Sequence, residues 1–199
     1  MIKLPNLFLC NTNYLQINKL KINVYILFQF IILITISEKL IASTISIEQS
    51  VFRITNFQQS PDWQSPWKMK STSRGQGTGF LIKNNLILTN AHVVSNSKML
   101  LVSKMSSPEP FLADVVSIAH DSDLALLKVR ESRFYSGLKP LELGGIPKLR
   151  SRVRAYGYPI GGKELSRTEG VVSRIEFGTY IHSGIDPHLL IQTDSAINP

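Results

Sequence analysis

The chain has 199 residues, of which 43% are hydrophobic and 18% are charged, and its formal net charge is +8. This balance excludes an intrinsically disordered chain, because such chains have too few apolar residues to form a core. Cys10 is the single cysteine, so an intramolecular disulfide framework is also excluded.

Residues 1–43 have the layout of a secretory signal peptide. Lysines precede a 13-residue apolar run at 24–36, and the small residues Ala42 and Ser43 follow it. The run is shorter than the roughly 20 residues of a spanning helix, so we expect export without a stable membrane span. The alternative is an uncleaved leader that anchors the chain to the inner membrane.

Residues 44–69 are interpreted as an N-terminal extension. Positions 45–57 alternate only imperfectly between apolar and polar residues and also fit a short helix, and a proline-bounded loop follows. Trp63 and Trp67 in that loop have two open interpretations. They either make contacts between subunits or cover one end of a barrel.

Residues 70–133 predict an antiparallel β-barrel, because short apolar runs alternate with polar or Pro/Gly turns. The predicted strands are 78–82, 86–89, 98–102, 111–119 and 124–129. His92 comes directly after the second of them, and Asp123 comes directly before the last. A rigid sheet would therefore fix the position of both side chains.

A histidine and a carboxylate are two parts of the catalytic arrangement that makes a serine nucleophilic. A serine hydroxyl is a weak nucleophile at neutral pH, so an imidazole must take its proton and a carboxylate must orient the imidazole. His92 is the candidate base and Asp123 the candidate orienting carboxylate. Taken singly, each also has a structural interpretation, as a packed or capping histidine and as a turn-forming aspartate.

Residues 134–199 predict a partial second β-barrel. A connection at 137–147 leads to predicted strands at 152–158, 168–175 and 188–192. Four alternating basic residues begin this part and are expected on one solvated strand face: Lys148, Arg150, Arg152 and Arg154. Because no aromatic residues are interleaved with them, no nucleic-acid partner is expected.

The other histidines do not indicate a metal site. His120, His182 and His188 lie near aspartates, but their spacings match no common zinc pattern. We interpret them as loop histidines and expect neither a metal nor another cofactor.

Six sequence blocks, distributed over most of the chain, support the interpretation of His92 and Asp123 as catalytic residues. They are GQGTGF (75–80), ILTNAHVV (87–94), DLALLKV (123–129), GYPIGG (157–162), GVVSRI (170–175) and IQTDSAINP (191–199). In residue identity, order and spacing they resemble the Deg/HtrA family of trypsin-like serine proteases, over roughly residues 50–199. The resemblance implies an all-β fold, a chymotrypsin-like double antiparallel β-barrel with the second barrel incomplete.

The resemblance also implies where the third catalytic residue lies. In the family the last block is followed by Gly-Asn-Ser-Gly-Gly, so the nucleophilic serine is expected just after Pro199. Ser195 stands where the family usually has alanine and lacks the flanking glycines that form an oxyanion hole. Residues 1–199 alone are therefore expected to be inactive.

The function implied is that of a serine endopeptidase acting on unfolded or damaged polypeptides, with a homotrimer as one possible assembly. Together with the signal-peptide layout of residues 1–43, the resemblance predicts location in a bacterial periplasm. One alternative is a pseudoprotease that binds polypeptide without cleaving it. Another is an exported basic binding protein in which His92 and Asp123 are structural.

Overall fold

The computed structural model describes residues 47–65, 67–105, 107–159, 161–180, 184 and 187–196. The expected signal peptide, its apolar run, Cys10 and His182 lie outside these residues. Within the described ranges, no helix has both the length and the apolar character needed to cross a membrane.

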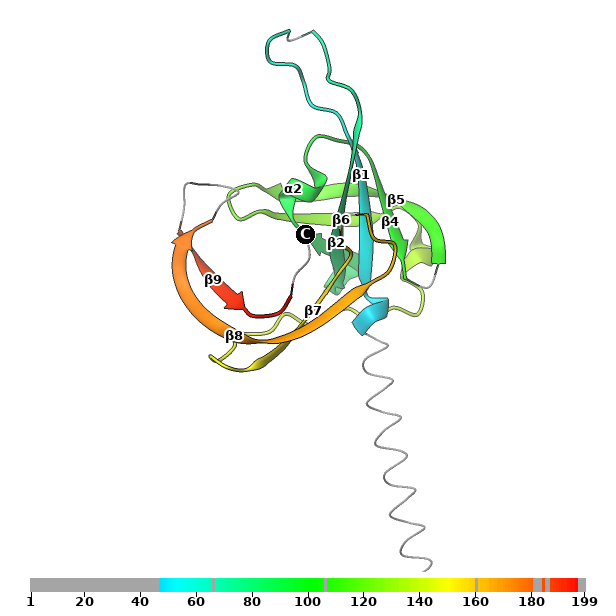
Figure 1. Cartoon of the computed structure of the whole chain (residues 1–199). Helices are drawn as coiled ribbons and strands as arrows, with labels where there is room; N and C mark the ends of the chain where they lie inside the picture. The colour runs from blue at the N-terminus through cyan, green and yellow to red at the C-terminus, as the bar shows by residue number, and fades with distance from the viewer. Residues whose placement is uncertain are drawn as a thin grey trace, which may run out of the picture. The chain divides into compact units, whose positions relative to one another are not determined.

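Six antiparallel strands close into a barrel (Figure 1). In chain order they are β1 (Val51–Gln58), β2 (Ser73–Ile82), β3 (Leu86–Thr89), β4 (Ser97–Lys104), β5 (Ser107–Ala119) and β6 (Leu124–Val129). Around the barrel the order is β1-β2-β3-β6-β5-β4, and β4 pairs with β1 to close it. Closure leaves no free strand edge, so the barrel is a rigid base for the residues at its strand ends.

The barrel interior is filled by alternating apolar side chains. On β6, Ala125, Leu127 and Val129 are buried, as the two-residue repeat of a strand requires. A 3₁₀ turn, η2 (Ser132–Tyr135), places the buried ring of Phe134 against this core. Its centroid lies 4.9 Å from that of Phe52, in an edge-to-face arrangement.

The barrel begins earlier than the sequence indicates. β1 lies within the expected N-terminal extension at 44–69, yet it pairs with both β2 and β4. Its alternation is weak because residues of both faces are buried: Phe52 and Ile54 belong to the core, and Val51 and Thr55 are also covered. A strand buried on both faces lacks the polar face that makes strands recognisable.

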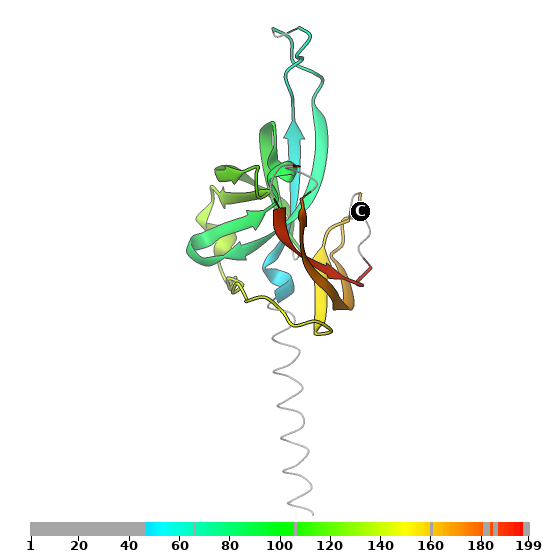
Figure 2. The ribbon, with the colours of Figure 1, turned by 90° about the vertical axis from the view of Figure 1, so that its left-hand side faces the viewer.

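Trp63 and Trp67 lie in the connection between β1 and β2, which extends away from the barrel (Figure 2). Backbone bonds hold this extension together, including those from Asp62 N to Lys68 O and from Lys70 N to Ser60 O. The two tryptophans are 83% and 82% exposed. The interpretation in which they cover one end of the barrel is therefore wrong.

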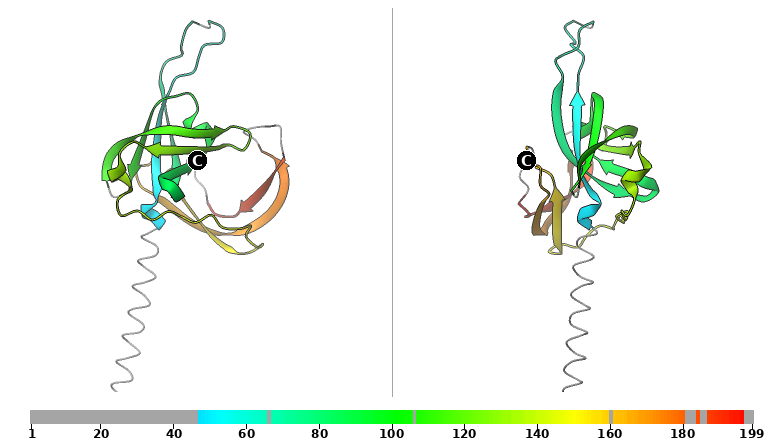
Figure 3. Two further views of the ribbon diagram at one scale, coloured as in Figure 1. Left: turned by 180° about the vertical axis from the view of Figure 1, so that it is seen from behind. Right: turned by 90° about the vertical axis from the view of Figure 1, so that its right-hand side faces the viewer.

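A three-stranded antiparallel sheet follows the barrel. It consists of β7 (Arg152–Gly157), β8 (Ser166–Thr179) and β9 (Pro187–Thr193), in that spatial order. Figure 3 shows it from two further sides as a curved sheet next to the barrel, and β7 contacts β1. The expected connection at 137–147 contains no helix or strand.

The four basic residues do not share one strand face. Lys148 and Arg150 precede β7, and Arg150 has a positive φ of 65° in the turn there. Only Arg152 and Arg154 lie on the strand, and Arg154 forms a 2.7 Å ion pair with Glu169 of β8. The turn before β7 breaks the alternation on which that prediction depended.

The all-β prediction is confirmed. β3 and β6 have the predicted bounds, and the other six predicted strands each correspond to an observed strand with shifted ends. The second sheet has three strands in the described part of the chain and does not close on itself.

Candidate active site

His92 lies on a one-turn helix, α2 (Ala91–Val94), that directly follows β3. Ala91 and Val94 of this turn are buried against the barrel, so the turn cannot rotate freely. Its His92 side chain faces outward and is 54% exposed. The imidazole is therefore accessible although its backbone is anchored.

Strand register explains why Asp123 meets His92. β3 and β6 are antiparallel, with Thr89 opposite Ala125. The residues just after Thr89 therefore lie beside the residues just before Ala125. Asp123 closes a turn at 120–123 with a positive φ of 52°, and the N–H of Ala91 donates to its carbonyl at 3.1 Å.

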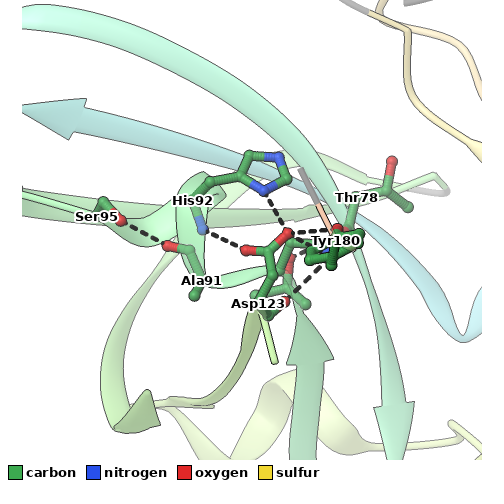
Figure 4. A network of polar contacts seen from close by, with 8 residues as sticks. Thr78, Ala91, His92, Ser95, Asp123 and Tyr180 are labelled. Atoms are coloured by element: carbon green, nitrogen blue, oxygen red, sulfur yellow. Dashed lines mark hydrogen bonds and ion pairs between the residues drawn. The ribbon is translucent and has the colours of Figure 1, made fainter. Parts of the chain in front are cut away.

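The carboxylate of Asp123 is completely buried and receives several donors (Figure 4). The backbone N–H of His92 donates to Oδ1 at 2.9 Å, and Nδ1 of His92 lies 2.7 Å from Oδ2. Asn90 Nδ2 also donates to Oδ2, at 3.1 Å. Because an ionised carboxylate can only accept, Nδ1 carries the proton and Nε2 is the basic nitrogen of the ring.

Tyr180 supplies a further donor to the same carboxylate. It follows β8 directly, and its hydroxyl donates to Oδ2 of Asp123 at 2.9 Å. Burial raises the pKa of the Asp123 carboxyl, but the hydrogen bonds from His92 and Tyr180 outweigh it, so the pKa lies below its ordinary value. The carboxylate therefore stays ionised at neutral pH.

The pKa of Tyr180 shifts in the opposite direction to that of Asp123. Burial, and then the hydrogen bond to Asp123, raise the pKa of the Tyr180 hydroxyl above its ordinary value. The phenol remains protonated at neutral pH and can keep donating. Sequence reasoning missed Tyr180, because it lies 57 residues from Asp123 and belongs to no chemical motif.

Asn56 supports the helical turn from beneath and was also missed. Its side chain on β1 is fully buried, and Nδ2 donates to the carbonyls of Val93 and Ser95, both at 3.0 Å. These carbonyls lie at the end of α2, where no further turn can satisfy them. The polar residue within β1 is thus a C-terminal anchor for the turn that carries His92.

The glycines of the first sequence block are close-packing positions. A Cβ built on Gly77 would lie 2.6 Å from both methyl groups of Val93, the neighbour of His92. A Cβ on Gly79 would lie 2.7 Å from Ile54 and 2.8 Å from Ile87. Strands β1 and β3 and the helical turn can approach β2 this closely only because Gly77 and Gly79 have no side chain.

The fourth block joins the second sheet to the barrel. Gln76 Nε2 on β2 donates to the carbonyls of Pro159 and Gly162, at 3.0 and 2.8 Å. The N–H of Tyr158 donates to Thr78 Oγ1 at 2.8 Å. Two sequence blocks more than 80 residues apart therefore meet.

Ser195 takes no part in this network of hydrogen bonds. It is buried, and its Oγ has no hydrogen-bond partner among the residues that the structure describes. The neighbouring Asp194 accepts the N–H of Val171 at 2.5 Å and packs tightly against Gly170. These contacts indicate that residues 194–195 hold β8 in place.

The other described histidines form no metal centre. His188 lies on β9 and not in a loop, so its interpretation as a loop histidine is wrong, and its Nε2 is 3.0 Å from the carbonyl of Asp121. His120 lies in the turn before Asp123. Across the described ranges, no cluster of three histidine, cysteine or carboxylate side chains could hold a metal ion.

Comparison with known proteins finds relatives among peptidases. A model of the trypsin-like peptidase domain matches residues 77–199. Protease Do-like 4, mitochondrial, from Arabidopsis thaliana, is 43% identical over 150 residues, and the Serine protease DegP homolog of Plasmodium falciparum (isolate 3D7) is 37% identical over 139. These alignments cover 75% and 70% of this chain, which spans only 29% and 16% of the two relatives.

A solved structure has the same fold. The Rv3671c protease from M. tuberculosis in its active form superimposes with a TM-score of 0.58 and 26% sequence identity, covering 78% of this chain and 63% of that one. The chymotrypsin-like arrangement expected from the sequence is thus confirmed.

Proposed function

Since the chain belongs to the trypsin-like peptidases, in the Deg/HtrA family, we propose that its barrel carries the general base of a serine endopeptidase. His92 is the base and Asp123 orients it. The observation that carries the proposal is the 2.7 Å contact between Nδ1 of a half-exposed imidazole and a buried carboxylate. The substrates are unfolded or damaged polypeptides, a class taken from the family.

The arrangement accounts for both proton transfers of acyl transfer. As a serine oxygen bonds to the acyl carbon, its proton passes to Nε2 of His92. The imidazolium is stabilised by the ionised Asp123, which stays unprotonated. His92 then gives the proton to the departing amine as the peptide C–N bond breaks.

On the family resemblance, we propose that the nucleophile belongs to a Gly-Asn-Ser-Gly-Gly segment directly after Pro199. Residues 1–199 do not include such a segment, so we expect them alone to cleave no peptide bond. Ser195 does not take the role, because it is buried and lacks flanking glycines.

Casein hydrolysis by a chain that continues through the proposed Gly-Asn-Ser-Gly-Gly segment, called the complete product below, tests the assignment. Asp123→Asn should lower kcat by roughly four orders of magnitude, because the neutral amide favours the wrong imidazole tautomer. Asp114→Asn is the matched control, since Asp114 is an exposed carboxylate paired with Arg130 at 2.7 Å. Equal loss of activity in the two variants would refute the role given to Asp123.

A second candidate is binding of polypeptide without cleavage. β9 is an edge strand among the described residues, and Phe177, Leu189 and Ile191 on β8 and β9 are exposed. An extended peptide could add to such an edge through main-chain bonds. Saturable binding of unfolded casein by a complete product that shows no turnover would favour this candidate.

The oligomeric state and the cellular location are also proposals. The exposed Trp63 and Trp67 are available for contacts within a homotrimer, and residues 1–43 would direct export to a bacterial periplasm. Light scattering of the wild-type chain and of a double alanine variant tests the first point. Fusion of residues 1–43 to a reporter, followed by N-terminal sequencing, tests the second.

A further inference from the structure

Asp123 is held from two sides. The barrel provides Asn90 and His92, which donate to the carboxylate from the segment that follows β3. The second sheet provides Tyr180, whose hydroxyl reaches Oδ2 at 2.9 Å (Figure 4). The donor set of the carboxylate is therefore shared between two sheets that have no common strand.

His188 fixes the tyrosine and the turn together. Thr179 at the end of β8 pairs with Pro187 at the start of β9, so Tyr180 and His188 lie diagonally across the strand pair. Their rings meet edge to face, with centroids 5.8 Å apart. His188 Nε2 also lies 3.0 Å from the carbonyl of Asp121, in the turn that carries Asp123.

The turn has a backbone conformation that needs such support. Asp123 has a φ of 52°, in the left-handed region that non-glycine residues rarely adopt. Residues in such conformations persist where their surroundings hold them. A hydrogen bond to a buried, ionised carboxylate is among the strong ones, and it restricts rotation of the carboxylate about its last bond.

We propose that Tyr180 is a positioning residue for Asp123 and that His188 holds Tyr180 in place. Through this contact the end of the second sheet keeps Oδ2 directed at Nδ1 of His92. The inference rests on the proposed function, in which Asp123 orients the base. It adds that the base is aligned only when the β8–β9 end is in contact with the turn at 120–123.

Amide hydrogen exchange of residues 1–199, followed by NMR, tests the contact without any turnover. The His92 amide donates to the other oxygen of Asp123, so it reports whether the carboxylate is held. In Tyr180→Phe we expect this amide to exchange about tenfold faster, the effect of losing one bond to a charged group. The amide of Leu127 in the barrel core should keep its rate.

Tyr158→Phe is the matched control. Tyr158 is a buried tyrosine near the second sheet, and its hydroxyl has no hydrogen-bond partner among the described residues. Its loss should leave the His92 amide unchanged. An unchanged His92 amide in Tyr180→Phe, or equal acceleration at His92 and Leu127, would overturn the proposal.

Kinetics of the complete product separate this inference from the function on which it rests. Tyr180→Phe should lower kcat about tenfold and leave KM unchanged, because the phenol acts on Asp123 and not on the substrate. A change confined to KM would contradict the positioning role. A wild-type product without peptidase activity would count against the proposed function alone, since the exchange result does not depend on it.

Discussion

At the scale of single residues, the ionised state of Asp123 links the site to folding. Its pKa is lower in the folded chain than the ordinary value of about 3.9. The carboxylate therefore stabilises the fold at any pH above that value. This contribution is lost as the pH falls through the folded-state pKa.

Asp123→Asn should reveal this dependence. At pH 7 the variant should be less stable by about 2 kcal/mol, because its neutral amide replaces a charge that accepts several hydrogen bonds. The difference from wild type should shrink below about pH 4, because Asp123 is then protonated in the unfolded chain before it is protonated in the folded one. Urea unfolding at pH 7 and pH 3 measures it, and a pH-independent difference would contradict the argument.

Asn56 is expected to fix the position of the helical turn that carries His92. Asn56→Ala leaves two carbonyls at the end of α2 without their donor and should cost about 2–3 kcal/mol. Gln59→Ala removes a similar amide-to-carbonyl bond, of 3.0 Å, at an exposed position. Its cost should stay within about 0.5 kcal/mol in the same unfolding measurement.

At the scale of elements, the packing of β2 against α2 depends on glycine. Gly77→Ala places a methyl group against Val93 and should cost about 1–3 kcal/mol by overpacking. Gly75→Ala is the control on the same strand, because its nearest neighbour would be 3.9 Å away. Thermal unfolding of both variants compares them, and equal costs would show that the Val93 contact is unimportant.

Strands were predictable where one face is polar or where turns delimit a short apolar run. β3 and β6 lie between clear turn residues, and their bounds match the prediction. β1 was missed because Val51 and Thr55 on one face and Phe52 and Ile54 on the other are all buried. Its pairing partners are distant in sequence, and alternation alone does not reveal them.

The candidate site was predictable only in part for a similar reason. His92 and Asp123 are flanked by apolar strands, and their residue types indicate a chemistry. Asn56 and Tyr180 contribute through the fold, since each reaches the site from a part of the chain that is distant in sequence. Such partners become visible once the strand order is known.

At the scale of the whole molecule, the closed barrel and the open sheet should differ in resistance to proteases. The barrel has no free edge, whereas the three-stranded sheet leaves β7 and β9 unpaired on one side within the described residues. Limited trypsin digestion should cut first at the exposed Lys68 and Lys70 and within 134–199. Mass spectrometry of the fragments checks this, and equal resistance of 134–199 and 73–129 would contradict it.

The most direct test of the central claim is labelling by a fluorophosphonate, which reacts with an activated serine. The complete product should be labelled at the serine of the proposed Gly-Asn-Ser-Gly-Gly segment, and His92→Ala should slow labelling by roughly a thousandfold or more. Residues 1–199 alone should remain unlabelled. Labelling that is unaffected by His92→Ala, or labelling of residues 1–199 at Ser195, would contradict the assignment of His92 and Asp123 as the base and its orienting carboxylate.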